Sequence, residues 1–247
     1  MKNIFYILLL TTQIFFAQNG FEAGNDLYQK GKYNEAVAAY ENVLKGNKQS
    51  AELYFNLGNS YYKLNKVAPA IYNYEKALVF SPNDSEVLTN LRFAQKRTID
   101  EVKVIPKVGF AKLLRDFTAI YHYNTWAWIS VSFSVLFLLS FIGYYFSQST
   151  VFKRMFFFGM LAMVFLLVIS ISAAIFEKSH FKNEIPAIVF AEMVEVKSEP
   201  QKLASNVVTL HEGTKVYVKE TLKNWKKIQL TDGTDGWIET SAIKEVK

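Results

Sequence analysis

The sequence predicts a membrane protein of several domains: an all-α solenoid, a hairpin of two transmembrane helices and a C-terminal all-β barrel. Three observations carry this prediction. A 34-residue period runs through residues 18–100, two uncharged apolar segments follow it, and short alternating runs fill residues 186–247. The chain has 247 residues, of which 51% are hydrophobic. Its mean hydropathy of +0.07 is high for a soluble domain, so a membrane portion is expected.

Residues 1–17 are predicted to be a secretory signal peptide. Lys2 gives the basic start, residues 4–16 form an apolar run too short to span a bilayer, and Ala17 offers a small residue for cleavage. Phe15 is bulky where a small residue is preferred, which leaves an uncleaved anchor as the alternative. A cleaved signal peptide would place residues 18–123 on the outer side of the membrane.

Residues 18–100 contain copies of one motif spaced 34 residues apart. The second copy has a Leu-Gly pair, spaced aromatic and alanine residues and a closing proline: Leu57, Gly58, Tyr61, Ala70, Tyr74, Ala77 and Pro82. This pattern resembles the tetratricopeptide repeat, in which paired helices stack on neighbouring copies. The first copy matches less well, with Ala23 in place of the leucine. A single helix over about residues 85–98 is expected to cap the stack.

Four asparagines are the candidate binding residues of the repeats: Asn25, Asn56, Asn59 and Asn90. The tetratricopeptide resemblance implies that such positions of the first helices line the concave groove. An asparagine amide both donates and accepts hydrogen bonds, so these side chains suit an extended peptide backbone. Phe21 stands where a carboxylate-binding repeat would use a lysine, which argues against capture of a terminal carboxylate. The alternative is that the asparagines are surface or capping residues.

Residues 101–123 are predicted to be an amphipathic juxtamembrane segment. Apolar residues recur there at helical spacing, opposite Lys112 and Arg115: Phe110, Leu113, Leu114, Phe117, Ile120 and Tyr121. A helix of this kind would lie on the membrane surface and lead into the first span. The alternative is a helix packed on the last repeat helix.

Residues 124–146 and 155–176 are predicted to be transmembrane helices, because each run exceeds 20 residues and contains no Asp, Glu, Lys or Arg. Residues 147–154 connect them, and residues 177–185 link the second span to the C-terminal domain. Because neither span holds a charged group, the hairpin is predicted to be an anchor and not a transport pathway. Serines in the spans are expected to bond between the helices: Ser130, Ser132, Ser134, Ser170 and Ser172.

The expected location is a bacterial inner membrane, with the repeats and the C-terminal domain in the periplasm. The signal peptide gives this orientation, and so does the Lys153-Arg154 pair, which favours a cytoplasmic loop at residues 147–154. Basic residues before the first span argue the other way: Lys107, Lys112 and Arg115. The net charge of +6 is concentrated at such membrane-flanking positions and not on a folded face, which argues against binding of nucleic acid.

Five short strands that form a small barrel are predicted in residues 186–247, from alternating runs at 187–196, 214–220, 225–230 and 235–239. Several stretches resemble bacterial SH3 domains: Glu212-Gly213-Thr214, Trp225, Asp232-Gly233 and Gly236-Trp237-Ile238. The resemblance makes Trp225 and Trp237 candidate ligand-binding residues. The alternative is that both tryptophans mainly fill the barrel. Glu239 and Ala242 stand where proline-binding SH3 domains have Pro and Tyr, so recognition of a proline-rich ligand is not expected.

The sequence shows no constellation typical of an enzyme, a cofactor site or a metal site. It has no cysteine, and its three histidines, His122, His180 and His211, are not spaced as metal ligands. No glycine-rich phosphate loop or nucleophile elbow occurs in a suitable context. We therefore expect no catalytic residues, no cofactor and no bound metal.

The order of signal peptide, repeats, two-span hairpin and SH3-like domain resembles the BatE-like proteins of the Bacteroidetes aerotolerance (Bat) operon. The resemblance implies partners: membrane proteins with von Willebrand A domains, a BatD-type protein and a MoxR-type ATPase. It implies a non-enzymatic adaptor that binds proteins through both modules. The alternative is a cell-wall sensor or a regulator of peptidoglycan enzymes, in which the barrel binds a peptidoglycan peptide.

Overall fold

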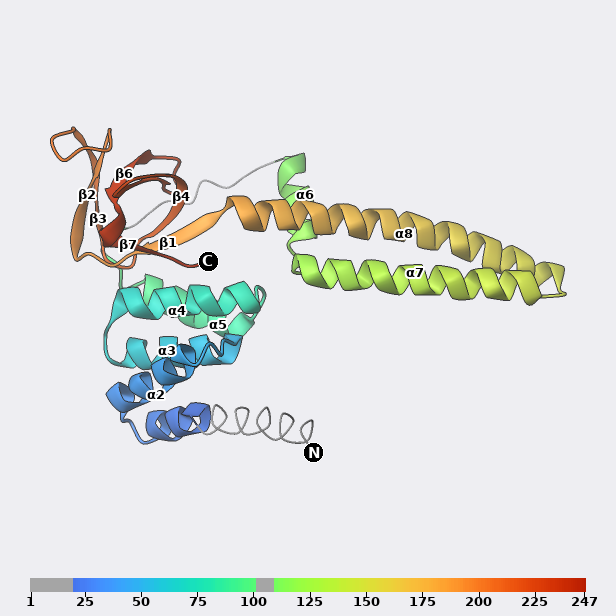
Figure 1. Ribbon diagram of the computed structural model, residues 1–247, viewed down its shortest axis with the longest axis horizontal. Helices are drawn as coiled ribbons and strands as arrows, with labels where there is room; N and C mark the ends of the chain where they lie inside the picture. The colour runs from blue at the N-terminus through green and yellow to red at the C-terminus, as the bar shows by residue number, and fades with distance from the viewer. Residues whose placement is uncertain (1–19, 101–108) are drawn as a thin grey trace, which may run out of the picture. The chain divides into compact units, whose positions relative to one another are not determined.

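The computed structural model describes residues 20–100 and 109–247, which fold into two compact units (Figure 1). One unit contains the repeats together with Ile185–Lys247, and the other lies within Pro106–Glu184. The predicted signal peptide lies outside the described residues, and so do the first eight residues of the predicted juxtamembrane segment.

Five helices form the repeat region and confirm the predicted solenoid (Figure 1). They are a helix over residues 20–29, α2 (Tyr33–Lys45), α3 (Ala51–Lys63), α4 (Val67–Phe80) and α5 (Ser85–Gln95). The turns inside the two helix pairs are equivalent, since Gly31 has φ 75° and Asn65, 34 residues later, has φ 58°. Glycine and asparagine accept this left-handed conformation most readily. Ser50 and Asp84 begin α3 and α5, where their side-chain oxygens accept first-turn N–H groups.

Matching contacts between a glycine and a tyrosine pack the two helices of each repeat against each other. A Cβ atom on Gly24 would lie 2.4 Å from the Tyr40 ring, and one on Gly58 would lie 2.8 Å from the Tyr74 ring. Both tyrosines are fully buried. The small residue therefore makes room for the ring.

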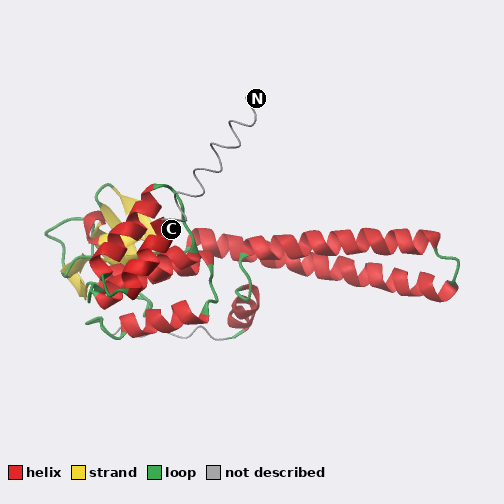
Figure 2. Ribbon diagram, turned by 90° about the horizontal axis from the view of Figure 1, so that it is seen from below, coloured by secondary structure: helices red, strands yellow, loops and turns green. Residues whose placement is uncertain are grey.

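Residues 185–247 form one antiparallel sheet of seven strands with an apolar core, and these strands are yellow in Figure 2. The strands are β1 (Ile185–Val189), β2 (Met193–Lys197), β3 (Asn206–His211), β4 (Lys215–Leu222), β5 (Trp225–Gln229), β6 (Asp235–Glu239) and β7 (Ile243–Glu245). Their order is β3-β2-β6-β5-β4-β1-β7. The core consists mainly of aliphatic side chains: Ala187, Val189, Val196, Leu210, Val216, Val218, Ile228, Leu230, Ile238, Ala242 and Ile243. The predicted all-β fold is confirmed.

The sequence predicts five of these strands and misses β3 and β7. These two strands are the ends of the strand order. In β3 only Leu210 is fully buried, and β7 has three residues. Edge strands are commonly short and only partly covered, so their alternation of polar and apolar residues is weak.

The second unit is a helical hairpin of α7 (Tyr123–Phe146) and α8 (Thr150–Asn183), preceded by the short helix α6 (Phe110–Thr118). Both α7 and α8 are long and apolar enough to cross a membrane. α8 extends beyond the predicted span at both ends, because residues 150–154 and 177–183 contain no helix-breaking proline or glycine. Its 34 residues measure about 51 Å, more than the ~30 Å of a hydrocarbon core. The charged ends of α8 therefore extend past an apolar middle.

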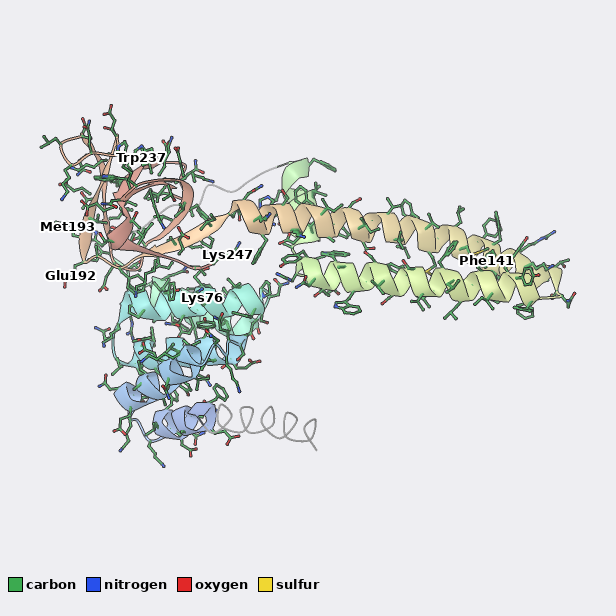
Figure 3. The ribbon with its side chains drawn as sticks, viewed as in Figure 1. Lys76, Phe141, Glu192, Met193, Trp237 and Lys247 are labelled. Carbon is green, nitrogen blue, oxygen red and sulfur yellow. The ribbon has the colours of Figure 1, made fainter. Side chains whose placement is uncertain are left out.

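Small side chains join the two long helices. The Oγ atoms of Ser130 and Ser170, two of the five serines expected to bond between the helices, lie 2.9 Å apart and are buried. Ser132 and Ser134 instead donate to carbonyl oxygens of their own helix, four residues earlier. Many apolar side chains of the hairpin are exposed, and Phe141 (Figure 3) has an exposed fraction of 49%. This exposure differs from that of a helix in the core of a soluble domain.

α6 packs on the end of the hairpin and keeps an apolar surface exposed. Arg115 forms an ion pair of 2.8 Å with Glu177, and the Trp126 indole N–H donates to the carbonyl oxygen of Thr118. Phe110 and Leu113 are 79% and 68% exposed. The amphipathic character predicted for this segment is therefore present in α6, and its exposed face suits a membrane surface.

Candidate partner-binding sites

The four asparagines predicted to line the groove come together as two equivalent pairs. Asn56 Nδ2 donates to Asn25 Oδ1 at 2.9 Å, and Asn90 Nδ2 donates to Asn59 Oδ1 at 2.9 Å. Each pair joins the first helices of neighbouring repeats, and all four side chains are half-buried. We call Asn25, Asn56, Asn59 and Asn90 the asparagine ladder.

A buried tyrosine completes each pair. Tyr40 Oη donates to Asn25 Oδ1 and Tyr74 Oη donates to Asn59 Oδ1, both at 2.7 Å. Burial raises the pKa of Tyr40 to about 12, and burial also raises the pKa of Tyr74. Both phenols therefore remain protonated donors at neutral pH. Because Asn25 Oδ1 and Asn59 Oδ1 each accept two hydrogen bonds, the orientation of both amides is fixed.

The ladder lies inside helices and retains hydrogen-bonding capacity. None of its members caps a helix, since Asn25 lies in the helix of residues 20–29, Asn56 and Asn59 in α3, and Asn90 in α5. Within the described part of the chain, Oδ1 of Asn56 and of Asn90 has no hydrogen-bond partner, and neither has Nδ2 of Asn25 or Asn59. A ligand that offers alternating N–H and C=O groups, such as an extended peptide, matches this set of acceptors and donors.

Trp225 lines a pocket of about 480 Å³ on the barrel. The other lining residues are Lys202, Asn224, Glu239, Thr240 and Ser241. The Oγ1 atom of Thr240 is buried without a hydrogen-bond partner among the described residues. Burying a hydroxyl without a hydrogen-bond partner costs free energy. A polar ligand group that bonded to this hydroxyl would recover part of that cost. The pocket therefore combines one aromatic ring with an unsatisfied hydroxyl and the ion pair of Lys202 with Glu239, 3.7 Å apart.

Trp237 lies outside this pocket, although it shares a face of the sheet with Trp225. Trp225 pairs with Glu239, and Lys227 pairs with Trp237, so both tryptophans are on the outer face of β5 and β6. Both are half-buried, and neither belongs to the barrel core. Ala242 is buried in that core. Because Trp225 is the single aromatic residue of the six that line the pocket, the pocket differs from the aromatic-lined groove that binds proline-rich segments.

The structure also brings the repeats and the barrel together through Asp100, which the sequence does not single out. Its carboxylate accepts from the Thr214 hydroxyl at 2.5 Å and from the His211 backbone N–H at 2.7 Å, and the His211 ring nitrogen Nδ1 lies at 2.7 Å. Burial acts to raise the pKa of Asp100, but the hydrogen bonds from Thr214 and His211 outweigh it and hold the pKa below its usual value. Asp100 is therefore a charged anchor for the β3–β4 turn.

A partly buried ion pair reinforces this contact. Lys215 Nζ lies 2.7 Å from both carboxylate oxygens of Glu75, whose exposed fraction is 6%. Ile188 and Val246 of the barrel belong to the same buried apolar cluster as the α4 side chains. Gly213 completes the fit, because its φ of 89° favours glycine and a Cβ atom there would lie 2.7 Å from Thr98. The barrel thus covers the face of α4 that a further repeat would otherwise cover.

The Asp100–His211 pair differs from the acid–base pair of a hydrolase. The Thr214 hydroxyl bonds to Asp100 and not to the imidazole, so the histidine does not activate it as a nucleophile. Within the described residues no group of three or more His, Cys, Asp or Glu side chains could hold a metal ion. The pair fits a structural contact.

Comparison with protein families identifies both modules. A family described as TPR repeat matches residues 24–65, one described as tetratricopeptide repeat matches residues 51–84, and one described as bacterial SH3 domain matches residues 191–245. No curated protein matches the chain. The chain therefore contains TPR repeats and a bacterial SH3 domain, which are interaction modules and typically not catalytic.

Proposed function

We propose that this protein is a non-enzymatic adaptor, anchored in the bacterial inner membrane by α7 and α8, with the repeats and the SH3 domain in the periplasm. The asparagine ladder is the observation that carries the proposal. It is repeated in register, oriented by buried tyrosines and supplied with unused donors and acceptors. A Bat-type complex is the proposed setting, because the order of modules resembles BatE-like proteins. Von Willebrand A-domain membrane proteins, and a MoxR-type ATPase system, are then the partners to look for.

The double variant Asn56→Ala/Asn90→Ala is expected to weaken capture of those partners about tenfold, since several peptide hydrogen bonds are lost. The repeats should stay folded, because each substitution removes one partly buried hydrogen bond worth about 1 kcal/mol. The measurement is affinity capture of the full-length protein from mild-detergent membranes, with quantification of the co-purifying proteins.

Asn42→Ala/Gln95→Ala is the matched control, because both side chains are exposed on helices of the same repeats. Equal capture by the ladder variant, the control variant and the unmodified protein would show that the ladder is not the binding site. If only cell-wall enzymes are captured, the result argues against a Bat-type complex and for the alternative function.

The alternative function is a cell-wall sensor, and the Trp225 pocket favours it. A peptidoglycan peptide would place polar groups against the unsatisfied Thr240 hydroxyl and an apolar stem on the indole ring. Trp225→Ala is expected to reduce binding of the full-length protein to isolated sacculi about tenfold, as is typical for loss of an aromatic anchor. Trp237→Ala, outside the pocket, should reduce it less. If neither variant changes sedimentation with sacculi, the pocket does not bind the wall.

A further inference from the structure

A continuous row of aromatic rings and lysines crosses from the repeats to the barrel. It begins on the repeats, where the rings of Tyr54 and Phe80 stack with centroids 5.7 Å apart. Lys76 of α4 (Figure 3) follows, with Nζ 6.0 Å from the Tyr54 ring and 5.8 Å from the Tyr72 ring. These distances are within the range of a cation–π contact.

The row continues onto the barrel. The Tyr72 ring meets the Phe190 ring edge to face at 5.7 Å, and Lys244 Nζ lies 4.3 Å above the Phe190 ring. Phe190 directly follows β1, which packs on α4, and Lys244 is in β7, which pairs with β1, so this edge of the barrel supplies the second half. We call these six residues the junction row: Phe80, Tyr54, Lys76, Tyr72, Phe190 and Lys244.

The junction row carries two positive charges that have no carboxylate partner in the described part of the chain. The neighbouring acids are already paired, Glu75 with Lys215 and Glu245 with Lys226. Lys76 is half-buried, and this burial lowers its pKa because the charged form is desolvated. An anion beside Lys76 would stabilise its charged ammonium group and so offset the desolvation. Phe80, at the end of the row, is 47% exposed and adds apolar surface.

We propose that the junction row binds a segment of a partner protein in which acidic side chains alternate with apolar ones. The two lysines match carboxylates in charge, and the rings between them match apolar side chains. A peptide suits this surface better than a lipid headgroup, because charge and aromatic surface alternate along a line and are not gathered at one point. The site lies apart from both the asparagine ladder and the Trp225 pocket, so it adds a third contact surface to the proposed adaptor.

The test measures fluorescence anisotropy of a labelled peptide in which glutamate alternates with leucine, titrated with the full-length protein in a neutral detergent. Lys76→Gln/Lys244→Gln is expected to weaken binding about tenfold, the loss expected for two partly exposed ion pairs. Phe80→Ala should weaken it several-fold through loss of apolar contact. A matched peptide with glutamine in place of glutamate should bind poorly to all forms.

Lys63→Gln/Lys219→Gln is the control, since it removes one exposed lysine from each module. An equal loss in this variant would overturn the proposal, because binding would then follow net charge alone. If Lys76→Gln/Lys244→Gln loses more binding to vesicles of phosphatidylglycerol than to the peptide, the proposal is overturned in favour of a lipid. The ladder variant Asn56→Ala/Asn90→Ala should bind the peptide normally, so failure of the ladder and failure of the junction row give different results.

Discussion

Replacing Lys215 by methionine is expected to destabilise the unit of repeats and barrel by about 3 kcal/mol. The reason is Glu75, which has an exposed fraction of 6% and receives both of its short contacts from Lys215. Without the ammonium group its carboxylate is left buried and unpaired. Urea unfolding of the full-length protein in detergent, followed by tryptophan fluorescence, measures the change.

The double variant Lys215→Met/Glu75→Leu separates this cause from a general loss of packing. It should recover most of the stability, because an apolar pair can replace a buried ion pair at little cost. Lys219→Met, an exposed position on the same strand, should change stability by less than about 0.5 kcal/mol. If Lys215→Met leaves the free energy of unfolding unchanged, the ion pair does not stabilise the protein as proposed.

Asp100→Ala is expected to cost about 3 kcal/mol, because it removes the acceptor of three donors at once. The Thr214 hydroxyl and the His211 N–H would then lose their partner at the β3–β4 turn. The same unfolding experiment measures the loss. Susceptibility of residues near the turn to limited proteolysis should rise with it, since the barrel would be held to α4 by fewer contacts.

Asp100 also gives this contact a defined pH dependence. Because the pKa of Asp100 in the folded protein is below its usual value of ~3.9, its stabilising contribution is complete above that value. The contribution is lost as the pH falls through the lower folded pKa. The difference in unfolding midpoint between the unmodified protein and Asp100→Asn should therefore be constant at neutral pH and shrink in acid. A difference that grows on acidification would contradict the assigned contacts.

The sequence predicts the repeats well because their packing is local. The 34-residue offset that aligns Asn25 with Asn59 and Tyr40 with Tyr74 aligns their hydrogen bonds as well. The periodicity did not show that these four residues bond to one another, since it assigns a face and not a partner. The sequence predicts only that the asparagines line the groove, and the structure joins them in pairs.

The contact between repeats and barrel could not be predicted, because its partners are more than 100 residues apart and follow no common period. One signal was available. Glu41 and Glu75 are equivalent repeat positions, and Glu41 accepts from the Tyr61 hydroxyl of the next repeat. The residue 34 positions after Tyr61 is Gln95, which lacks a phenol. Glu75 is thus free to pair with a group from elsewhere in the chain, and the structure supplies Lys215.

The hairpin is an insertion between two parts of one folded body, and this restricts how the chain can thread a bilayer. Asp100 precedes α7 and His211 follows α8, yet the two are in direct contact. A single crossing would leave them on opposite sides of the lipid, so their contact requires an even number of crossings between them. The order of synthesis adds a second constraint. The repeats leave the ribosome first, and the face of α4 stays open until the hairpin and then the barrel have been made.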